Sequence, residues 1–379
     1  MFKAVVIIKA VFVFVLFIIL IESSFGQKPY SFNLIYDGEM PDKVRGMEKR
    51  LMTFNLADYA QDQLLFINNK DFAIYQFNGG KWELRYYGEI DFADFEYKHL
   101  KSGDIDNDGD DELLILKNSS ITIYNFTDGN FTGATYEFAF YPEDALIGDI
   151  NNDSSNELVM LCADEPGIND RFDTEYNLCI YNYSDQELDL FWSDNSSLKL
   201  SSSNAVVPPQ KLMCISDIDN TGYNKLIIPG IQSDVSPTYF NVFYWHESAL
   251  IRSGSFRITE LSDTLITSGF NKDLRKDSGL SREEVDKFFK ENRLQRYVFH
   301  DMRPGILNNE TQLLTDIIEK RVIPVTIKIN DNNVIIYRLS DVSINSSWLR
   351  WFNIDGQGTG ILHTYYPDDS DIACFEFYR

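Results

Sequence analysis

Short apolar stretches alternate with Asn- and Gly-rich turns through most of this chain of 379 residues. Gln63–Asn78 (QLLFINNKDFAIYQFN) and Glu112–Thr127 (ELLILKNSSITIYNFT) share one pattern at a constant offset of 49 residues: a strand, a four-residue polar turn and a second strand. A third strand is predicted after each pair, at Lys81–Tyr87 and at Ala134–Phe140. Aromatic and β-branched residues at alternate positions between such turns are typical of an antiparallel meander.

The same pattern predicts further strands before and after this region. They are expected at Ser31–Tyr36, Leu158–Cys162, Asn177–Tyr183, Leu188–Trp192, Leu226–Ile228, Tyr239–Trp245, Leu250–Ile258, Val325–Ile329, Val334–Leu339, Trp348–Phe352 and Ile372–Tyr378. A repeat of 45–50 residues with about four short strands has the size of one blade of a β-propeller. The strands left over at the two ends are predicted to share one blade and so to close the ring. Six or seven blades both fit the count.

The pattern changes between residues 260 and 321, where we expect a small helical insertion. Ser281-Arg282-Glu283-Glu284 forms a capping box that predicts a helix of about ten residues. A second helix is predicted at Thr311–Lys320. The expected fold is therefore all-β, a single six- or seven-bladed β-propeller over residues 27–379 with this insertion inside it.

Acidic residues alternate in the stretch Gly103–Leu116, GDIDNDGDDELLIL. Asp104, Asp106 and Asp108 occupy every second position, and Glu112 follows four residues after the last of them. Alternating carboxylates in a tight turn point inward, which suits a hard cation with oxygen ligands, Ca²⁺ first. An EF-hand would place its closing acidic ligand at position twelve. Here that ligand stands at position nine, before an apolar strand.

The spacing recurs along the chain. Copies begin at Asp149 (DINNDSSNE), at Asp217 (DIDNTGYNK) and at Asn353 (NIDGQGTG), and a decayed copy stands at Asn55–Ile67. This pattern resembles the FG-GAP (VCBS) repeat of integrin α-subunit propellers and their relatives. In that family the side chains at positions one, three, five and nine bind Ca²⁺, together with the main-chain carbonyl at position seven.

The resemblance implies structural Ca²⁺ in the loops, and the ligands follow position by position. They are Asp104, Asp106, Asp108, Asp110 (carbonyl) and Glu112 in the first loop, Asp149, Asn151, Asp153, Ser155 (carbonyl) and Glu157 in the second, and Asp217, Asp219 and Thr221 in the third. Lys225 stands at position nine of the third loop, where its ammonium opposes a metal ion and could take its place. The copy at Asn353 keeps only Asp355 as a charge, so no metal is expected there.

The N-terminus predicts secretion. Lys3 and Lys9 precede the apolar run Ala10–Ile21, and Ser24-Phe25-Gly26 provides small residues before a cleavage site at Gln27. The alternative is an uncleaved anchor beginning at Ala4, although Lys9 interrupts that longer run. We therefore expect residues 1–26 to be a signal peptide and the protein to be extracellular, with no membrane span after cleavage.

In an extracellular protein, glycosylation and disulfide formation are both expected. Sequons occur at Asn118, Asn125, Asn130, Asn182, Asn195, Asn309 and Asn345, and at Asn152, where the second loop makes a glycan least expected. Cys162 and Cys179 flank one hairpin loop and are predicted to form a disulfide, because facing positions in adjacent strands are close. The pairing of Cys214 and Cys374 stays open.

The net negative charge argues against two classes of binding partner. The chain has 34 Lys and Arg against 58 Asp and Glu, a net charge of −24, which repels nucleic acid and anionic membranes. The four histidines are scattered, and Gly356–Gly360 lacks the lysine of a phosphate-binding P-loop. We expect a non-enzymatic protein-binding or adhesion module with an extracellular protein or glycan ligand. A lectin of the FG-GAP propeller type is the alternative, and a polysaccharide-active enzyme is a third.

Overall fold

β-Strands make up all the regular secondary structure in the part of the chain that the computed structural model describes. This part comprises residues 34–39, 51–59, 61–68, 70–90, 100–163, 175–199, 213–231, 238–261, 299–307, 310–318, 322–330, 333–338, 348–352, 360–365 and 374–378. Within these residues there is no helix long and apolar enough to cross a membrane.

The strands are short and follow one another closely. They are β1 (Leu34–Glu39), β2 (Leu51–Phe54), β3 (Gln63–Ile67), β4 (Asp71–Asn78), β5 (Lys81–Glu89), β6 (Leu100–Gly103), β7 (Glu112–Lys117), β8 (Ser120–Thr127), β9 (Asn130–Glu137), β10 (Tyr141–Gly148), β11 (Glu157–Ala163), β12 (Glu175–Ser184), β13 (Glu187–Lys199), β14 (Cys214–Ser216), β15 (Lys225–Ile231), β16 (Thr238–His246), β17 (Ala249–Leu261), β18 (Phe299–Leu307), β19 (Glu310–Ile318), β20 (Val322–Asn330), β21 (Asn333–Arg338), β22 (Trp348–Phe352), β23 (Gly360–Tyr365) and β24 (Cys374–Tyr378).

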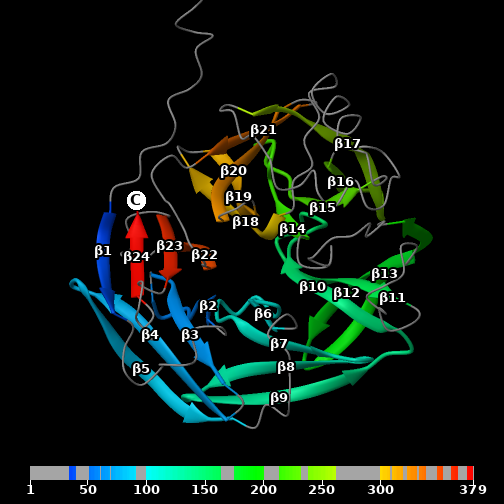
Figure 1. The fold of residues 1–379 in the computed structure, drawn as a ribbon. Coiled ribbons are helices and arrows are strands. Elements are labelled where there is room, and N and C mark those ends of the chain that lie inside the picture. The colour runs from blue at the N-terminus through cyan, green and yellow to red at the C-terminus, as the bar shows by residue number, and fades with distance from the viewer. Residues whose placement is uncertain are drawn as a thin grey trace, which may run out of the picture.

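Most sheets are four-stranded antiparallel meanders. β2–β5, β6–β9 and β10–β13 each form one sheet in chain order. β14–β17 and β18–β21 are two further meanders, joined into one eight-stranded sheet by parallel pairing of β17 with β21. The last sheet has the order β1-β24-β23-β22. The sheets succeed one another around a ring, the arrangement of a β-propeller (Figure 1).

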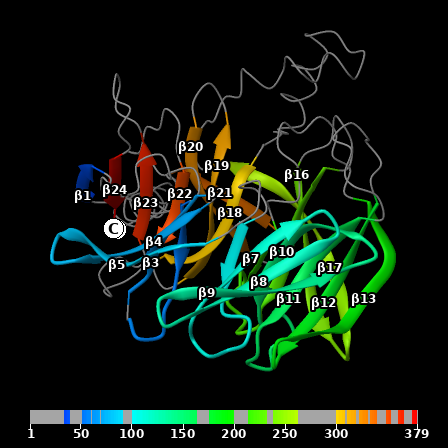
Figure 2. The ribbon, with the colours of Figure 1, turned by 90° about the horizontal axis from the view of Figure 1, so that it is seen from below.

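Strands from the two ends of the described chain share one sheet. β1 pairs antiparallel with β24, with Leu34 opposite Tyr378 and Glu39 opposite Cys374. The two strands lie side by side in both views of the ribbon (Figures 1 and 2). The prediction that both ends build one sheet is confirmed; the first three residues of the predicted strand Ser31–Tyr36 lie outside the described ranges.

The core lies between neighbouring sheets, which explains the apolar runs within β3, β7 and β11, the second strands of the first three meanders. Along β7, Leu113 and Ile115 pack into a cluster shared with β2–β4, whereas Leu114 and Leu116 pack against β11 and β12. β11 alternates in the same way between its two neighbouring sheets. A strand that is buried on both faces reads as a continuous apolar run. Such strands therefore lie between two layers of the ring.

Two predicted elements differ from the structure. Thr311–Lys320 is not a helix: residues 310–318 form β19, paired with β18 on one side and β20 on the other. A short apolar run such as Leu313-Leu314 does not distinguish helix from buried strand, so the neighbouring strands decide. The predicted insertion at 260–321 is thus partly sheet. β9 begins at Asn130, four residues earlier than predicted.

Other predictions fall on residues outside the described ranges. These are the signal peptide over residues 1–26, the helix beginning at Ser281, the copy of the loop at residues 353–358, and the sequons Asn309 and Asn345.

Candidate metal centre

Five successive hairpins place the same two repeat positions opposite each other. The facing pairs are Phe54 and Gln63, Gly103 and Glu112, Gly148 and Glu157, Ser216 and Lys225, and Gly305 and Gln312. Eight residues separate the partners in the first four hairpins, and six separate them in the last. In the first four hairpins the second partner is position nine of the repeat. In the fifth the connection is two residues shorter, so Gln312 corresponds to that position through its facing partner and not by count. The fifth hairpin was not predicted, and its sequence signal is Gln312-Leu313-Leu314, which matches Gln63-Leu64-Leu65.

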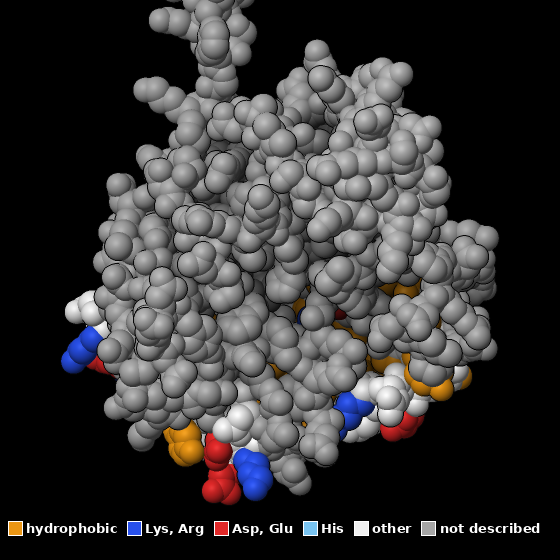
Figure 3. Space-filling view, viewed as in Figure 1, with side chains coloured by type: hydrophobic (Ala, Val, Ile, Leu, Met, Phe, Trp, Pro, Cys, Tyr) orange, Lys and Arg blue, Asp and Glu red, His pale blue; other side chains and the backbone are white. Residues whose placement is uncertain are grey.

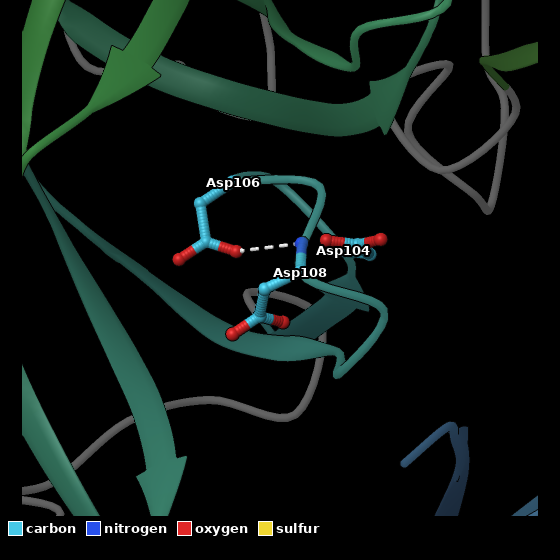
Figure 4. Close-up of side chains that lie close together, drawn as sticks. All are labelled: Asp104, Asp106 and Asp108. Carbon is cyan, nitrogen blue, oxygen red and sulfur yellow. Dashed lines mark hydrogen bonds between the residues drawn. The ribbon is translucent and has the colours of Figure 1, made fainter. Parts of the chain in front are cut away.

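In the first loop, between β6 and β7, three carboxylates converge. One oxygen from each of Asp104, Asp106 and Asp108 lies within 4.8 Å of the other two (Figure 4). The backbone N–H of Gly109 donates to Asp104 Oδ2 at 3.1 Å, and that of Asp108 donates to Asp106 Oδ1 at 3.3 Å. These turn bonds fix the side chains while leaving other carboxylate oxygens available.

Glu112 closes the same loop from the buried side. Its side chain is 1% exposed, and the backbone N–H of Ile105 donates to Oε2 at 2.9 Å. Burial, and secondarily the nearby aspartates, raises the pKa of Glu112 to about 8. No Lys, Arg or His among the described residues pairs with it. A carboxylate at this depth needs either a proton or a cation.

Asp104 adds an orphaned buried atom. Its Oδ1 is inaccessible to solvent and has no hydrogen-bond partner in the described part of the chain. Burial raises the pKa values of Asp104 and of Asp106. Four carboxylates with only oxygen donors, one of them deeply buried and one with an orphaned oxygen, fit a hard cation such as Ca²⁺. All four residues were predicted ligands, and the structure brings Asp104, Asp106 and Asp108 together within 4.8 Å, with Glu112 buried at the end of the same loop.

The second loop, between β10 and β11, repeats the arrangement with one amide. Carboxylate oxygens of Asp149, Asp153 and Glu157 lie within 4.8 Å of one another. Asn151 Nδ2 donates to Asp153 Oδ2 at 3.0 Å and to Glu157 Oε1 at 2.6 Å, so this amide bridges two of the carboxylates. Burial raises the pKa of Glu157 to about 7. The donor set again fits an oxygen-binding cation, with one carboxylate fewer than the first loop.

The third loop carries its own cation. Lys225 Nζ contacts Asp219 Oδ1, and it donates to Thr221 Oγ1 at 2.8 Å. Although burial works in the opposite direction, the hydrogen bonds from Lys225 and Thr221 lower the pKa of Asp219. The pKa values of Asp104 and Asp106 are raised instead. The ammonium therefore lies among the predicted ligands Asp217, Asp219 and Thr221, and it offsets the charge of one of the two aspartates.

Position nine makes the same bond in loops of different charge. The backbone N–H at position two donates to the position-nine side chain in three loops: Leu56 to Gln63 Oε1 at 2.9 Å, Ile105 to Glu112 Oε2 at 2.9 Å, and Ile150 to Glu157 Oε2 at 3.0 Å. Position nine thus holds the turn together whether or not the loop carries carboxylates. The decayed copy makes this bond although it has no acidic residue at positions one, three, five or nine.

Residues at position seven have contacts of their own. Asp110 Oδ1 accepts from the backbone N–H of Ala57 at 2.5 Å, which ties the first loop to the decayed copy. The backbone N–H of Ser155 donates to Asp153 Oδ1 at 2.8 Å. Their proposed role as carbonyl donors stays a prediction.

The predicted disulfide is wrong. Cys162 and Cys179 are free thiols, and both are buried in the core. Cys179 lies opposite Met160 and Cys162 opposite Asn177, so the two cysteines are diagonal neighbours and not a facing pair. Their side chains are hydrogen-bonded, and this contact together with burial raises the pKa of Cys162. Cys214 is also a buried free thiol.

The described sequons differ in exposure. Asn118, Asn130 and Asn182 are exposed, whereas Asn125 and Asn152 are half-buried. Asn125 Nδ2 contacts Asp106 Oδ2 at 3.5 Å, so it stands beside the first loop. Asn195 lies in β13. Glycosylation at these positions stays a prediction, and the exposed three fit it best.

No family model matches the sequence, and no curated protein matches it. The chain is similar to a solved structure described as BBS1N in complex with ARL6DN, soaked with mercury, at 10% identity and a TM-score of 0.43, covering 93% of this chain and 98% of that one. It is also similar to the exotype rhamnogalacturonan lyase YesX, at 12% identity and a TM-score of 0.34, covering 84% of this chain and 57% of that one. Likenesses this distant carry no argument about function.

Proposed function

We propose that this protein is a secreted, calcium-stabilised β-propeller of the FG-GAP type that acts as a non-enzymatic protein-binding or adhesion module. The observation that carries the proposal is the set of hairpin loops in one frame. The first loop gathers three aspartates within 4.8 Å and has buried Glu112 at position nine, and the second gathers Asp149, Asp153 and buried Glu157 within 4.8 Å. The third loop holds Lys225 at position nine. The same loop positions hold either a candidate cation site or a lysine, which indicates that positive charge stabilises these loops.

The ring has six blades in this proposal. The six meanders are β2–β5, β6–β9, β10–β13, β14–β17, β18–β21 and the shared sheet of β22–β24 with β1. The parallel contact of β17 with β21 joins two of them at their last strands and adds no further meander. The hairpin β18–β19 begins the meander β18–β21. This meander lies between the third loop and the copy at Asn353, a stretch in which the sequence alone allowed one blade or two.

Calcium would be held in two loops. Asp104, Asp106, Asp108 and Glu112 would bind one ion, and Asp149, Asp153 and Glu157 with Asn151 would bind another. A bound cation supplies positive charge that offsets the mutual repulsion of these carboxylates, so the loops would be stable with the acids ionised. Stabilisation by about 2.7 kcal/mol for each site is expected when free Ca²⁺ exceeds the dissociation constant 100-fold.

Exposed apolar side chains on neighbouring sheets support a role in binding protein. Leu190 and Phe191 on β13 are 56% and 41% exposed, and Ile251 on β17 is 37% exposed. Phe191 stacks on Trp245 of β16 with ring centroids 5.2 Å apart. Where described side chains reach the surface in Figure 3, hydrophobic groups stand among acidic and basic ones. A mixture of aliphatic and aromatic groups with charged neighbours suits a protein partner.

The test uses the full-length secreted chain as bait in extracellular fluid, with millimolar Ca²⁺ or excess chelator. We expect capture of a defined protein in Ca²⁺, lost with the Phe191→Asp variant and retained with Tyr223→Asp, which changes an exposed aromatic residue on the third loop. Binding of glycans on an array with no protein captured would favour the lectin. Turnover of a polysaccharide would favour the enzyme. Ca²⁺-independent melting would contradict the structural role of the ion.

A further inference from the structure

Side chains at two repeat positions join the first loop to the second. Asn107, at position four of the first loop, accepts through Oδ1 from the backbone N–H of Asn156 at 2.9 Å. Asn156, at position eight of the second loop, donates from Nδ2 to the backbone carbonyl of Asp104 at 2.6 Å. We call these two bonds the rung between the loops. The rung spans about 50 residues of sequence, so it forms only when the two sheets are neighbours.

The same rung recurs between the second and third loops. Asn152 Oδ1 accepts from the backbone N–H of Asn224 at 2.7 Å, and Asn224 Nδ2 donates to the carbonyl of Asp149 at 2.8 Å. One of the two bonds also forms between the third loop and β19: the backbone N–H of Thr311 donates to Asn220 Oδ1 at 3.0 Å. The repetition shows that the contact belongs to the repeat and is not an accident of one loop.

The backbone at position four explains the residue type. Asn107, Asn152 and Asn220 have φ values of 62°, 62° and 55°, in the left-handed region where asparagine is one of the few favoured side chains. Glycine would adopt this turn equally well but would have no oxygen for the rung. The turn and the rung can therefore be separated experimentally.

Each end of the rung stands next to a carboxylate of a metal loop. Asn107 lies between Asp106 and Asp108, and Asn156 directly precedes Glu157. An ion that orders the first loop would therefore also hold the backbone that positions Glu157 in the second. We propose that the first and second loops bind cations as a coupled pair, with the Asn107–Asn156 rung as the coupling element. This inference rests on the proposed calcium sites.

Coupling of this kind is reciprocal and is measured as a change in affinity. Disabling the first loop with Asp106→Ala should weaken Ca²⁺ binding at the second loop by about 5-fold or more, the lower end of typical coupling. Disabling the second loop with Asp153→Ala should weaken the first loop by the same factor. Both constants come from calorimetric Ca²⁺ titration of the full-length secreted chain, with the stepwise constants of the wild type as reference.

The rung is tested by repeating the titration in the Asn107→Gly background, which keeps the left-handed turn and removes the acceptor. There, Asp106→Ala should leave the affinity of the second loop unchanged. Asn220→Gly is the matched control, because it makes the same change at position four of the third loop, and coupling should persist. Asn156→Ala removes the other bond of the rung and serves as a second variant if Asn107→Gly does not fold.

The outcomes separate this inference from the proposed function. Independent binding of two ions in the wild type would contradict the coupling but would still support the proposed calcium sites. Coupling that survives both Asn107→Gly and Asn156→Ala would overturn the role of the rung. No Ca²⁺ uptake in the wild type would overturn the proposed sites, and the coupling with them.

Discussion

Lys225 Nζ lies against Asp219 Oδ1 in the third loop, and Lys225 occupies the repeat position that Glu112 occupies in the first loop. The lysine reaches into the loop from the first residue of β15 and is bonded to Thr221 as well. One loop of the ring thus contains a covalently attached cation where its neighbours contain an additional acid. The three loops therefore allow the effect of charge at position nine on cation binding to be compared.

Calcium dependence should follow this difference in charge. Chelation should lower the melting temperature, and Ca²⁺ should restore it better than Mg²⁺, which prefers a tighter octahedral site. Asp106→Ala should remove most of one ion's stabilisation, about 2.7 kcal/mol at 100-fold excess over the dissociation constant. Asp219→Ala should leave the calcium dependence unchanged. Melting curves of both variants with Ca²⁺ and with chelator check this, and identical wild-type curves in the two conditions would exclude calcium-dependent stability.

Reversing the charge of Lys225 should create a dependence that the third loop lacks. Lys225→Glu gives Asp217 and Asp219 a third carboxylate at position nine, the same number of carboxylates as in the second loop. We expect a lower melting temperature in chelator and one additional bound ion in calorimetric titration. Lys101→Glu is unsuitable as a control, because Lys101 pairs with buried Asp144 at 2.6 Å, so the exposed Lys81→Glu is used. An unchanged stoichiometry would show that position nine does not decide occupancy.

Glu112→Gln should have opposite effects with and without calcium. The amide oxygen can still accept from the N–H of Ile105, so the turn bond is kept. Without Ca²⁺ the variant no longer buries an acid, and we expect it to be more stable than the wild type by about 1–3 kcal/mol. With Ca²⁺ it lacks a ligand and should be the less stable of the two. Denaturant unfolding in both conditions checks the sign, with the exposed Glu137→Gln as control.

Most strands could be predicted from the sequence because hydrophobic periodicity reports burial directly. Strands buried on both faces, such as β7 and β11, read as apolar runs followed by turns. β19 was mistaken for a helix because Gln312 and Leu313 are both buried, which removes the alternation that marks a half-buried strand. Only its pairing with β18 and β20 fixes the extended conformation.

The clustering of the loop carboxylates could also be predicted, because their spacing lies within nine residues. The rungs could not, since Asn107 and Asn156 meet only through the packing of two sheets. The register of Cys162 and Cys179 likewise depends on how β11 and β12 pair, which hairpin length alone does not determine. Local spacing is visible in a sequence, whereas contacts between sheets are set by the assembled ring.

The glycine that precedes the first loop should be sensitive to a methyl group. A Cβ on Gly103 would lie 2.9 Å from Cβ of Ile147 in the next sheet, closer than real contacts allow. Gly103→Ala should therefore cost about 1–3 kcal/mol. Gly148 occupies the same repeat position, but its added Cβ would approach Ile215 only to 3.3 Å at a side-chain end, so Gly148→Ala should cost less. Equal losses in urea unfolding would contradict close approach of the sheets at Gly103.

Removing β1 should open the ring. β1 supplies the last strand of the sheet β1-β24-β23-β22, and its register with β24 runs from Leu34 opposite Tyr378 to Glu39 opposite Cys374. Deleting residues 34–39 leaves one side of β24 without backbone partners, and an unpaired edge promotes association between chains. We expect loss of soluble monomer in size-exclusion chromatography. Asp37→Ser, which keeps the backbone ladder, should remain monomeric. A monomeric deletion variant with unchanged melting would show that the ring does not depend on this strand.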